Sequence, residues 1–287
     1  MANKVAIVTD TTACIPREMV EKYGIELVPI EFILDGKAYR DGIDMSPADF
    51  YARLRQAKKL PTTSGSLPAP FLDAYQKASR RAESILCITE SSKLSGMFNS
   101  ARVATEMAKT TLPNVVIEVL ECASAAVGQG LVVLAAARAA AQGKSLTEVV
   151  TTVQKVMPQV NLFGVLDTLH YLVMGGRVPK AAAFVGSLLK IKPIFTVTEG
   201  EAYPVTNART NHGAVKSILK LMRQKIVKGQ PLHVAVMHAD ALDKATALKN
   251  RISSQFECKE IFITEFTPVM GVHTGPGVIG VAFYNGD

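Results

Sequence analysis

Short apolar runs alternate with longer amphipathic stretches along the first 160 residues of this chain. The runs are rich in β-branched residues and are bounded by polar or glycine-rich segments, so they predict buried strands at residues 5–9, 27–32, 85–89 and 115–120. The amphipathic stretches predict helices at residues 17–23, 47–58, 69–80, 96–111, 127–142 and 146–157. Apolar strands separated by helices are typical of a parallel sheet covered by helices on both faces.

The pattern changes near Asn161, after the break at Pro158. Strands are predicted at residues 162–166, 193–197, 234–238, 261–266 and 278–284, with helices at 212–228 and 240–255. Glu199-Gly200-Glu201 separates two strand-like runs and predicts a hairpin, hence an antiparallel pair in a mixed sheet. We therefore expect an α/β fold of two α/β domains, residues 1–160 with a mainly parallel sheet and residues 161–287 with a mixed sheet.

Composition narrows the classes of partner. The net charge of +7 suits an anionic ligand or an acidic partner. The basic residues are spread along predicted helices without interleaved aromatic residues, so nucleic-acid binding is not predicted. The chain runs almost directly into its first strand, and the longest apolar run, residues 131–141, is too short to span a bilayer. We expect a cytoplasmic protein with no integral membrane segment.

A glycine-rich segment near the C-terminus holds the first candidate for chemistry, Gly271-Val272-His273-Thr274-Gly275-Pro276-Gly277. The glycines allow close approach of the backbone, and His273 is the one side chain there that can carry a proton near neutral pH. These features suit a pocket for a small anionic group. The alternative is an ordinary turn.

Four further loops carry polar groups, three with hydroxyl or carboxyl side chains and a fourth with Arg177. Thr63 and Ser64 lie in a hydroxyl-rich loop, and Ser95-Gly96 opens a predicted helix, where free amides and the helix dipole favour a carboxylate or phosphate. Helix capping explains the same serines equally well. Asp10 follows the first strand, and a capping role with Thr11 and Thr12 is preferred there over metal binding or phosphoryl transfer.

Two arginines are candidates for holding an anion. Arg177 follows Gly175-Gly176, and Arg209 follows the predicted hairpin. The guanidinium is a fixed fork that fits a carboxylate or phosphate, whereas an exposed ion pair is the alternative for each.

The signatures of common enzymes are missing from the sequence. There is no phosphate-binding P-loop, dinucleotide fingerprint, zinc-protease motif or serine-hydrolase elbow. The histidines show no metal-ligand spacing with carboxylates or cysteines. We therefore predict no metal, no cofactor and no catalytic residue.

Taken together, the ordered motifs resemble the DegV family of bacterial fatty-acid-binding proteins nearly end to end. The segments that carry the resemblance are residues 7–12, 28–30, 41–42, 63–64, 91–96, 100–101, 169–172, 175–178 and 188–194, with Arg209 and residues 273–277. This resemblance implies a long-chain fatty acid enclosed between two α/β domains. It also implies that the protein is not itself an enzyme, but presents the acyl carboxylate to a separate ATP-binding fatty acid kinase subunit.

The resemblance also implies roles for individual residues. It places the ligand carboxylate at the two hydroxyl-rich loops, with further head-group contacts from the second half, and Arg177 on the surface that docks the kinase subunit. The implied ligand-binding residues are Thr63, Ser64, Ser95, Gly96, Arg209, His273 and Thr274.

Two departures from the family pattern limit what can be transferred. Met97-Phe98-Asn99 stands where the family has Thr-Tyr-Gln, and Glu121-Cys122 stands where it has Asp-Ser. Chain-length preference is therefore not transferable. Met97, Phe98 and Phe195 are expected to form an apolar wall, and core packing is the alternative for Met97 and Phe98.

Two other functions are left open. One is a phosphotransfer enzyme like dihydroxyacetone kinase, in which His273 would capture a small carbonyl substrate in a polar pocket. The other is a DNA-associated regulator, which rests on net positive charge alone. An apolar wall would favour the lipid over both.

Overall fold

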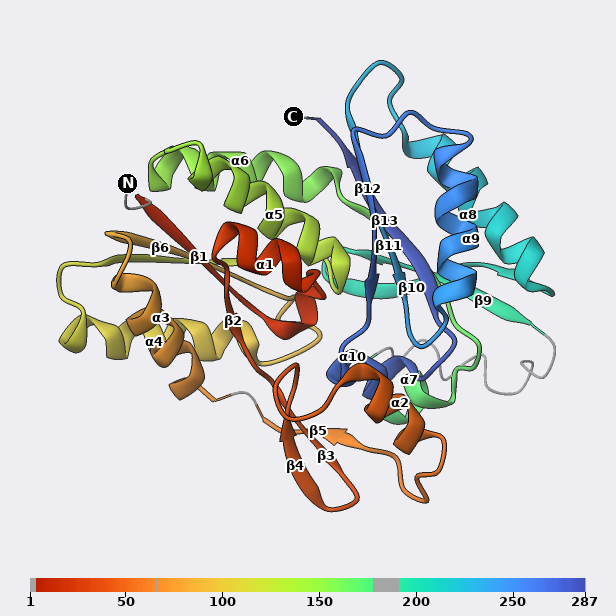
Figure 1. Cartoon of the computed structure of the whole chain (residues 1–287), viewed down its shortest axis with the longest axis horizontal. Helices are drawn as coiled ribbons and strands as arrows, with labels where there is room; N and C mark the ends of the chain where they lie inside the picture. The colour runs from red at the N-terminus through yellow and green to blue at the C-terminus, as the bar shows by residue number, and fades with distance from the viewer. Residues whose placement is uncertain (1–3, 66, 178–190, 287) are drawn as a thin grey trace.

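The first half of the chain forms a parallel sheet between two layers of helices (Figure 1). The computed structural model describes residues 4–65, 67–177 and 191–286. The strand order is β2-β1-β6-β7, and every pairing is parallel. These strands are β1 (Val5–Asp10), β2 (Glu26–Val28), β6 (Ser84–Thr89) and β7 (Val116–Glu121).

Helices cover both faces of this sheet, as the sequence predicts. One face packs against α3 (Ala69–Ser79) and α4 (Met97–Thr111). The other face packs against α5 (Val127–Ala141) and α6 (Leu146–Val156), and α1 (Arg17–Tyr23) lies against α5. Because β1 and most of β6 are buried on both faces, they read as unbroken apolar runs in the sequence.

The second half forms a mixed sheet of order β10-β9-β8-β13-β11-β12. Within this sheet, as far as the structure describes it, only the β11–β12 pair is parallel. The strands are β8 (Asn161–Val165), β9 (Lys192–Thr198), β10 (Glu201–Ala208), β11 (Leu232–His238), β12 (Glu260–Glu265) and β13 (Ile279–Asn285). Helices α8 (Asn211–Lys225) and α9 (Leu242–Ser253) pack on its outer face.

The predicted hairpin is confirmed between β9 and β10. Glu199 and Gly200 have φ values of 52° and 76°, the left-handed pair that a two-residue hairpin turn requires.

Helix α5 joins the two halves. It packs on β1 and β6 of the parallel sheet and on β11 and β13 of the mixed sheet. All of its residues except Arg138 and Ala141 are buried, which explains why its sequence is apolar on every side. The main core cluster accordingly contains residues from both halves. A domain boundary near residue 160, where β8 begins, stays a prediction.

The sequence analysis missed a third, small sheet. Its order is β4-β3-β5, built from β3 (Glu31–Leu34), β4 (Lys37–Arg40) and β5 (Thr62–Thr63), with α2 (Pro47–Leu54) following β4. The single strand predicted at residues 27–32 is therefore wrong, because the segment divides at Pro29 into β2 and β3, and proline cannot donate to a sheet ladder.

Two short helices were also missed, α7 (His170–Gly175) and α10 (Pro268–Thr274). They pack against each other, and α10 also contacts α2 and the small sheet. Within the part of the chain that the structure describes, no helix combines the length and the apolar character needed to cross a membrane.

Candidate functional site

A cavity of about 240 Å³ lies between the two large sheets and is bounded on one side by the small sheet and α10. Polar residues from the loops after β1 and β6 line one part of it, where the carboxyl ends of the parallel strands meet. Ligands of open α/β sheets bind at this edge. The inner face of the mixed sheet lines the remainder with apolar side chains.

The polar end of the cavity is built from segments far apart in the sequence. Thr63 lies on β5, and its Oγ1 is 3.3 Å from Nε2 of His273, in the last turn of α10. Arg177 follows α7, and its Nη2 donates to the same Oγ1 across 3.5 Å. Its Nη1 donates to the Gly175 carbonyl across 2.7 Å, which holds the guanidinium in place.

The structure brings together most of the residues that the resemblance implies. Six line the cavity: Thr63, Ser64, Ser95, Gly96, His273 and Thr274. Arg177, expected at a docking surface, is exposed and lines the cavity too. Arg209 is not among the lining residues and is exposed directly after β10. Val178 and residues 188–190, which belong to the segments that carry the resemblance, lie outside the described residues.

His273 occupies a helix and not the turn that its glycine-rich surroundings suggest. A Cβ atom on Gly175 would come within 2.7 Å of His273 Nδ1, so glycine is what allows α7 to approach the imidazole. Gly275, at φ 70°, ends the helix in a conformation that other residues rarely adopt.

The imidazole of His273 is neutral near pH 7. Burial, with a smaller contribution from the Arg177 charge, lowers its pKa to about 4. A neutral imidazole offers one donor and one acceptor, so it hydrogen-bonds a ligand without neutralising it. Among the described residues that line the cavity, Arg177 is the one permanent cation.

Glu90 is a cavity residue that the sequence analysis did not single out. It follows β6 directly, is 6% exposed, and its carboxyl accepts a hydrogen bond from the Ser95 hydroxyl. Burial and, to a smaller extent, the nearby charge of Asp10 together raise the pKa of Glu90 to about 8. The available signal was an acidic residue placed immediately after a buried strand, inside a loop already considered for its serines.

Asp10 performs the capping role that the sequence favoured. Its side chain accepts from the backbone N–H of Thr12 across 3.0 Å at the start of a 3-10 turn, Thr11–Ala13. It also accepts from Gln129 Nε2 across 3.2 Å and from the backbone N–H of Glu90 across 3.3 Å. Within the described ranges, nowhere do three His, Cys, Asp or Glu side chains gather as a metal ion would require.

The apolar wall of the cavity is formed by the mixed sheet. Its strand register places Phe195, Gly164, Gly280 and Met237 in one row across β9, β8, β13 and β11. Phe195, Gly164 and Met237 line the cavity, and Gly164 leaves space between Phe195 and Met237, whose methyl group lies over Gly280. We call this row the glycine trough.

Of the three residues expected in the apolar wall, Phe195 lines the cavity and the other two do not. Met97 is buried in the main core cluster. Phe98 is half-buried, with the Arg102 guanidinium 5.8 Å from its ring centre. The helical positions of both residues turn them away from the cavity.

The two halves are also tied together at the hairpin. The Gly200 N–H donates to the Ala123 carbonyl across 3.0 Å, and Lys93 pairs with Glu201 across 3.2 Å. The β9–β10 hairpin thus docks on the loops that follow β6 and β7.

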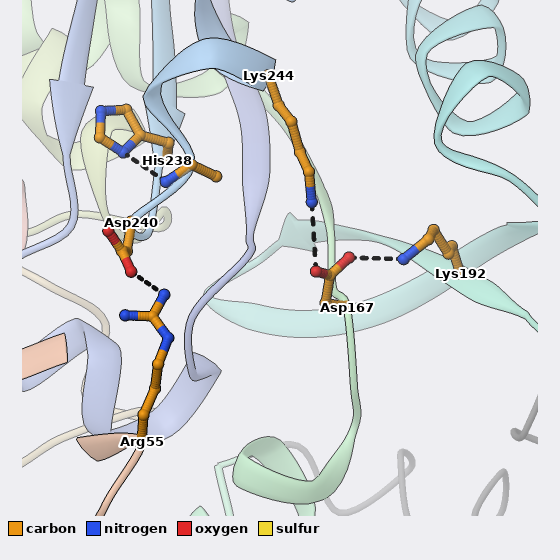
Figure 2. Close-up of polar contacts among 7 residues, drawn as sticks. Arg55, Asp167, Lys192, His238, Asp240 and Lys244 are labelled. Carbon is orange, nitrogen blue, oxygen red and sulfur yellow. Dashed lines mark hydrogen bonds and ion pairs between the residues drawn. The ribbon is translucent and has the colours of Figure 1, made fainter. Parts of the chain in front are cut away.

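Charged side chains also tie elements together outside the cavity, as Figure 2 shows. Arg55, just after α2, pairs with Asp240 after β11, while Asp167 bridges Lys192 at 2.6 Å and Lys244 at 3.4 Å. Each such exposed pair contributes roughly 0–1 kcal/mol. Their role is therefore to orient α2 and the strand ends, and they add little stability.

Comparison with known proteins identifies the family of this chain. The model of the DegV family of uncharacterised proteins matches residues 4–286. A DegV domain-containing protein of Caldanaerobacter subterraneus is 32% identical over 280 residues, which cover 98% of each chain. A DegV family protein from Thermus thermophilus, described as binding fatty acid, has a solved structure with a TM-score of 0.90, 29% identity and coverage of 98% of this chain and 99% of its own. The structure of DegV from Bacillus subtilis, described as a fatty acid binding protein, gives a TM-score of 0.88 at 29% identity and covers 99% of this chain and all of its own. This chain therefore belongs to the DegV family.

Proposed function

We propose that this protein binds a long-chain fatty acid in the cavity between its two halves. The carboxylate lies at the polar end, near Thr63, Ser95 and His273, and the acyl chain extends along the glycine trough. The observation that carries this proposal is the division of one cavity into a small polar end and a long apolar wall. The solved relatives from Thermus thermophilus and Bacillus subtilis, both described as binding fatty acid, support it.

The apolar wall decides between a lipid and a small polar substrate. Burying one methylene contributes about 0.8 kcal/mol, so twelve contribute roughly 10 kcal/mol before the costs of ordering the chain. A three-carbon carbonyl substrate would gain almost none of this energy and would leave Phe195, Leu166 and Met237 facing water. The lipid therefore fits this cavity better than the substrate of a dihydroxyacetone-kinase-like enzyme.

The head group would be held by hydrogen bonds and one cation. Thr63 donates its hydroxyl proton, Ser95 turns its hydroxyl proton from Glu90 to the ligand, the neutral His273 donates from one ring nitrogen, and Arg177 supplies the positive charge. Ser64, Gly96 and Thr274 line the same end. Arg209 is not among the residues that line the cavity, and its contribution to holding the head group stays a prediction.

We propose further that the bound carboxylate is presented to a separate ATP-dependent fatty acid kinase subunit in the cytoplasm, where ATP is available. Arg177 supports this idea, because it is exposed and also lines the cavity, so one side chain can face both the ligand and a partner. Acyl phosphate should then form only when this protein, the kinase subunit and ATP are mixed, and Arg177→Ala should slow its formation. Acyl phosphate formed without the kinase subunit would contradict a purely presenting role.

Fatty acid binding is tested by titrating delipidated protein with palmitate and measuring the dissociation constant by calorimetry. Thr63→Ala and Ser95→Ala should each weaken binding about tenfold, the loss expected for one hydrogen bond to a charged group. Ser95 Oγ also accepts from the Met97 N–H at the start of α4, so this variant loses a helix cap as well.

Ser46→Ala is the matched control, because Ser46 caps α2 and does not line the cavity. It should lower stability while leaving palmitate affinity unchanged. Equal affinities in all three variants would contradict the assigned head-group site.

A further inference from the structure

Glu90 lies at the polar end of the cavity, beside the proposed position of the ligand carboxylate. It lines the cavity together with Ser95, Thr63 and His273, and its carboxyl accepts a hydrogen bond from the Ser95 hydroxyl. Its side chain is 94% shielded from solvent, yet the head-group site needs no second negative charge. A buried acid beside an anion site therefore requires an explanation.

The groups around Glu90 determine which carboxyl carries the charge. On β1, burial raises the pKa of Asp10 as well, but its carboxyl accepts four hydrogen bonds, two from Thr12, one from Gln129 and one from the Glu90 N–H, and these favour its charged form. After α7, Arg177 is the nearby cation, and on α10 His273 is neutral near pH 7. Two carboxyl groups this close cannot both ionise cheaply in a buried site. Glu90 is therefore the one that keeps its proton.

The charged groups of the loops next to Glu90 have partners outside the cavity. At the end of β7, Glu121 accepts from the backbone N–H and hydroxyl of Ser92, each across 2.8 Å. In the neighbouring loop, Lys93 pairs with Glu201 of the hairpin. Neither carboxylate lines the cavity. Arg177 is thus the single cation that the described cavity lining offers to Glu90 and to a bound carboxylate.

We infer that Glu90 determines head-group specificity: its neutral carboxyl donates an O–H hydrogen bond to the ligand carboxylate, so the cavity accepts an acyl anion only while Glu90 keeps its proton. This inference rests on the proposed function and names the chemistry of its head-group selection. The proton stays within the Glu90–ligand pair, and no covalent bond is made or broken. A ligand with a neutral hydroxyl head group can instead donate to ionised Glu90, so it is insensitive to loss of that proton.

The test compares the pH dependence of binding for a carboxylate and an alcohol of equal chain length. Dodecanoate and 1-dodecanol are titrated into delipidated protein between pH 6.5 and 9.5, in the wild type, Glu90→Gln and Glu121→Gln. Glu121→Gln is the matched control, because it removes a neighbouring charge outside the cavity. His273, with its pKa of about 4, and the thiols of Cys14, Cys87 and Cys122, with pKa values of about 12, do not titrate in this range.

For the wild type and Glu121→Gln, the affinity for dodecanoate should fall roughly 30-fold from pH 6.5 to 9.5, following the fraction of protein with Glu90 protonated. For Glu90→Gln the affinity should change less than about threefold over the same range, because the amide keeps a donor at every pH. The affinity for 1-dodecanol should not fall with pH in any of the three proteins.

Three other results would overturn either the role of Glu90 or fatty acid binding itself. The same pH profile for dodecanoate in the wild type and Glu90→Gln overturns the inference and leaves fatty acid binding intact. A parallel loss of 1-dodecanol affinity overturns it too, since the pH effect then does not act through the carboxylate. Failure of the wild type to bind dodecanoate and palmitate at every pH overturns the proposed function itself.

Discussion

Filling the glycine trough should shorten the fatty acid that the protein prefers. Gly164 is the suitable position, because a Cβ atom there would lie 3.6 Å from Met237 Cε, which is an ordinary contact. In Gly164→Leu, four added carbons would occupy cavity space next to Phe195. They should displace three to four methylenes of a long acyl chain.

The size of the effect follows from the burial of those methylenes. At about 0.8 kcal/mol each, their loss amounts to roughly 3 kcal/mol, or about 150-fold in dissociation constant. Gly164→Ala adds one methyl group and should cost about fourfold at most. A short acid that does not reach the trough should bind all three proteins equally well.

The assay is a series of calorimetric titrations with octanoate, dodecanoate and palmitate against the delipidated wild type, Gly164→Ala and Gly164→Leu. The discriminating quantity is the ratio of the palmitate and octanoate affinities within each protein. If leucine weakens both acids by the same factor, or weakens neither, the acyl chain does not lie along this row.

Three further results are expected. Gly280→Ala should lower the free energy of unfolding by about 1–3 kcal/mol in urea melts, because its Cβ would lie 2.6 Å from the Phe163 carbonyl oxygen; unchanged stability would refute the close packing. The pKa of Glu90 rises from 4.5 to about 8 on folding, so its contribution to the free energy of unfolding is full below pH 4.5 and is lost as pH rises to 8. In Glu90→Gln this loss of stability between pH 4.5 and 8 should be smaller than in the wild type by at most about 5 kcal/mol. The same dependence of stability on pH in both proteins would argue against a protonated Glu90. The pKa of His273 falls from 6.5 to about 4 on folding, so its contribution to the free energy of unfolding is present above pH 6.5 and is lost as pH falls to 4. In His273→Asn this loss of stability at acid pH should be smaller than in the wild type by at most about 3 kcal/mol. Identical unfolding curves of the two proteins at acid pH would contradict a neutral buried imidazole.

Features determined by local sequence pattern were predictable. Strands β1 and β6 are buried on both faces, so their sequences are continuous apolar runs that need no knowledge of their neighbours. The turn at Glu199-Gly200 requires left-handed backbone, which makes glycine a strong local signal. The second left-handed pair, Asp35-Gly36 between β3 and β4, carries the same signal, although no hairpin is predicted there.

Features determined by tertiary contacts were not predictable from local pattern. Strand β5 has two residues and exists because Thr63 pairs with Phe32 of β3, thirty-one positions earlier in the chain. Helix α10 spans seven residues that include a proline and a glycine, and its close contacts with Tyr51 and Phe50 explain Gly271. Such short elements gain their stability from packing and not from propensity.

The candidate site shows the same division. The loops with Ser95 and His273 could be identified by their residue types, but their convergence on one cavity depends on the arrangement of three sheets. Glu90 was overlooked because a carboxyl group is an unexpected neighbour for an anion until its burial beside Asp10 is known. Arg209 was favoured by its chemistry, and only the fold places it outside the cavity lining.

The most direct measurement is native mass spectrometry of the protein as purified from a bacterial host, followed by denaturing lipid extraction. We expect one bound mass per chain, and an extracted compound that is a long-chain carboxylic acid. A protein that is empty when purified and takes up no added fatty acid would contradict the central claim.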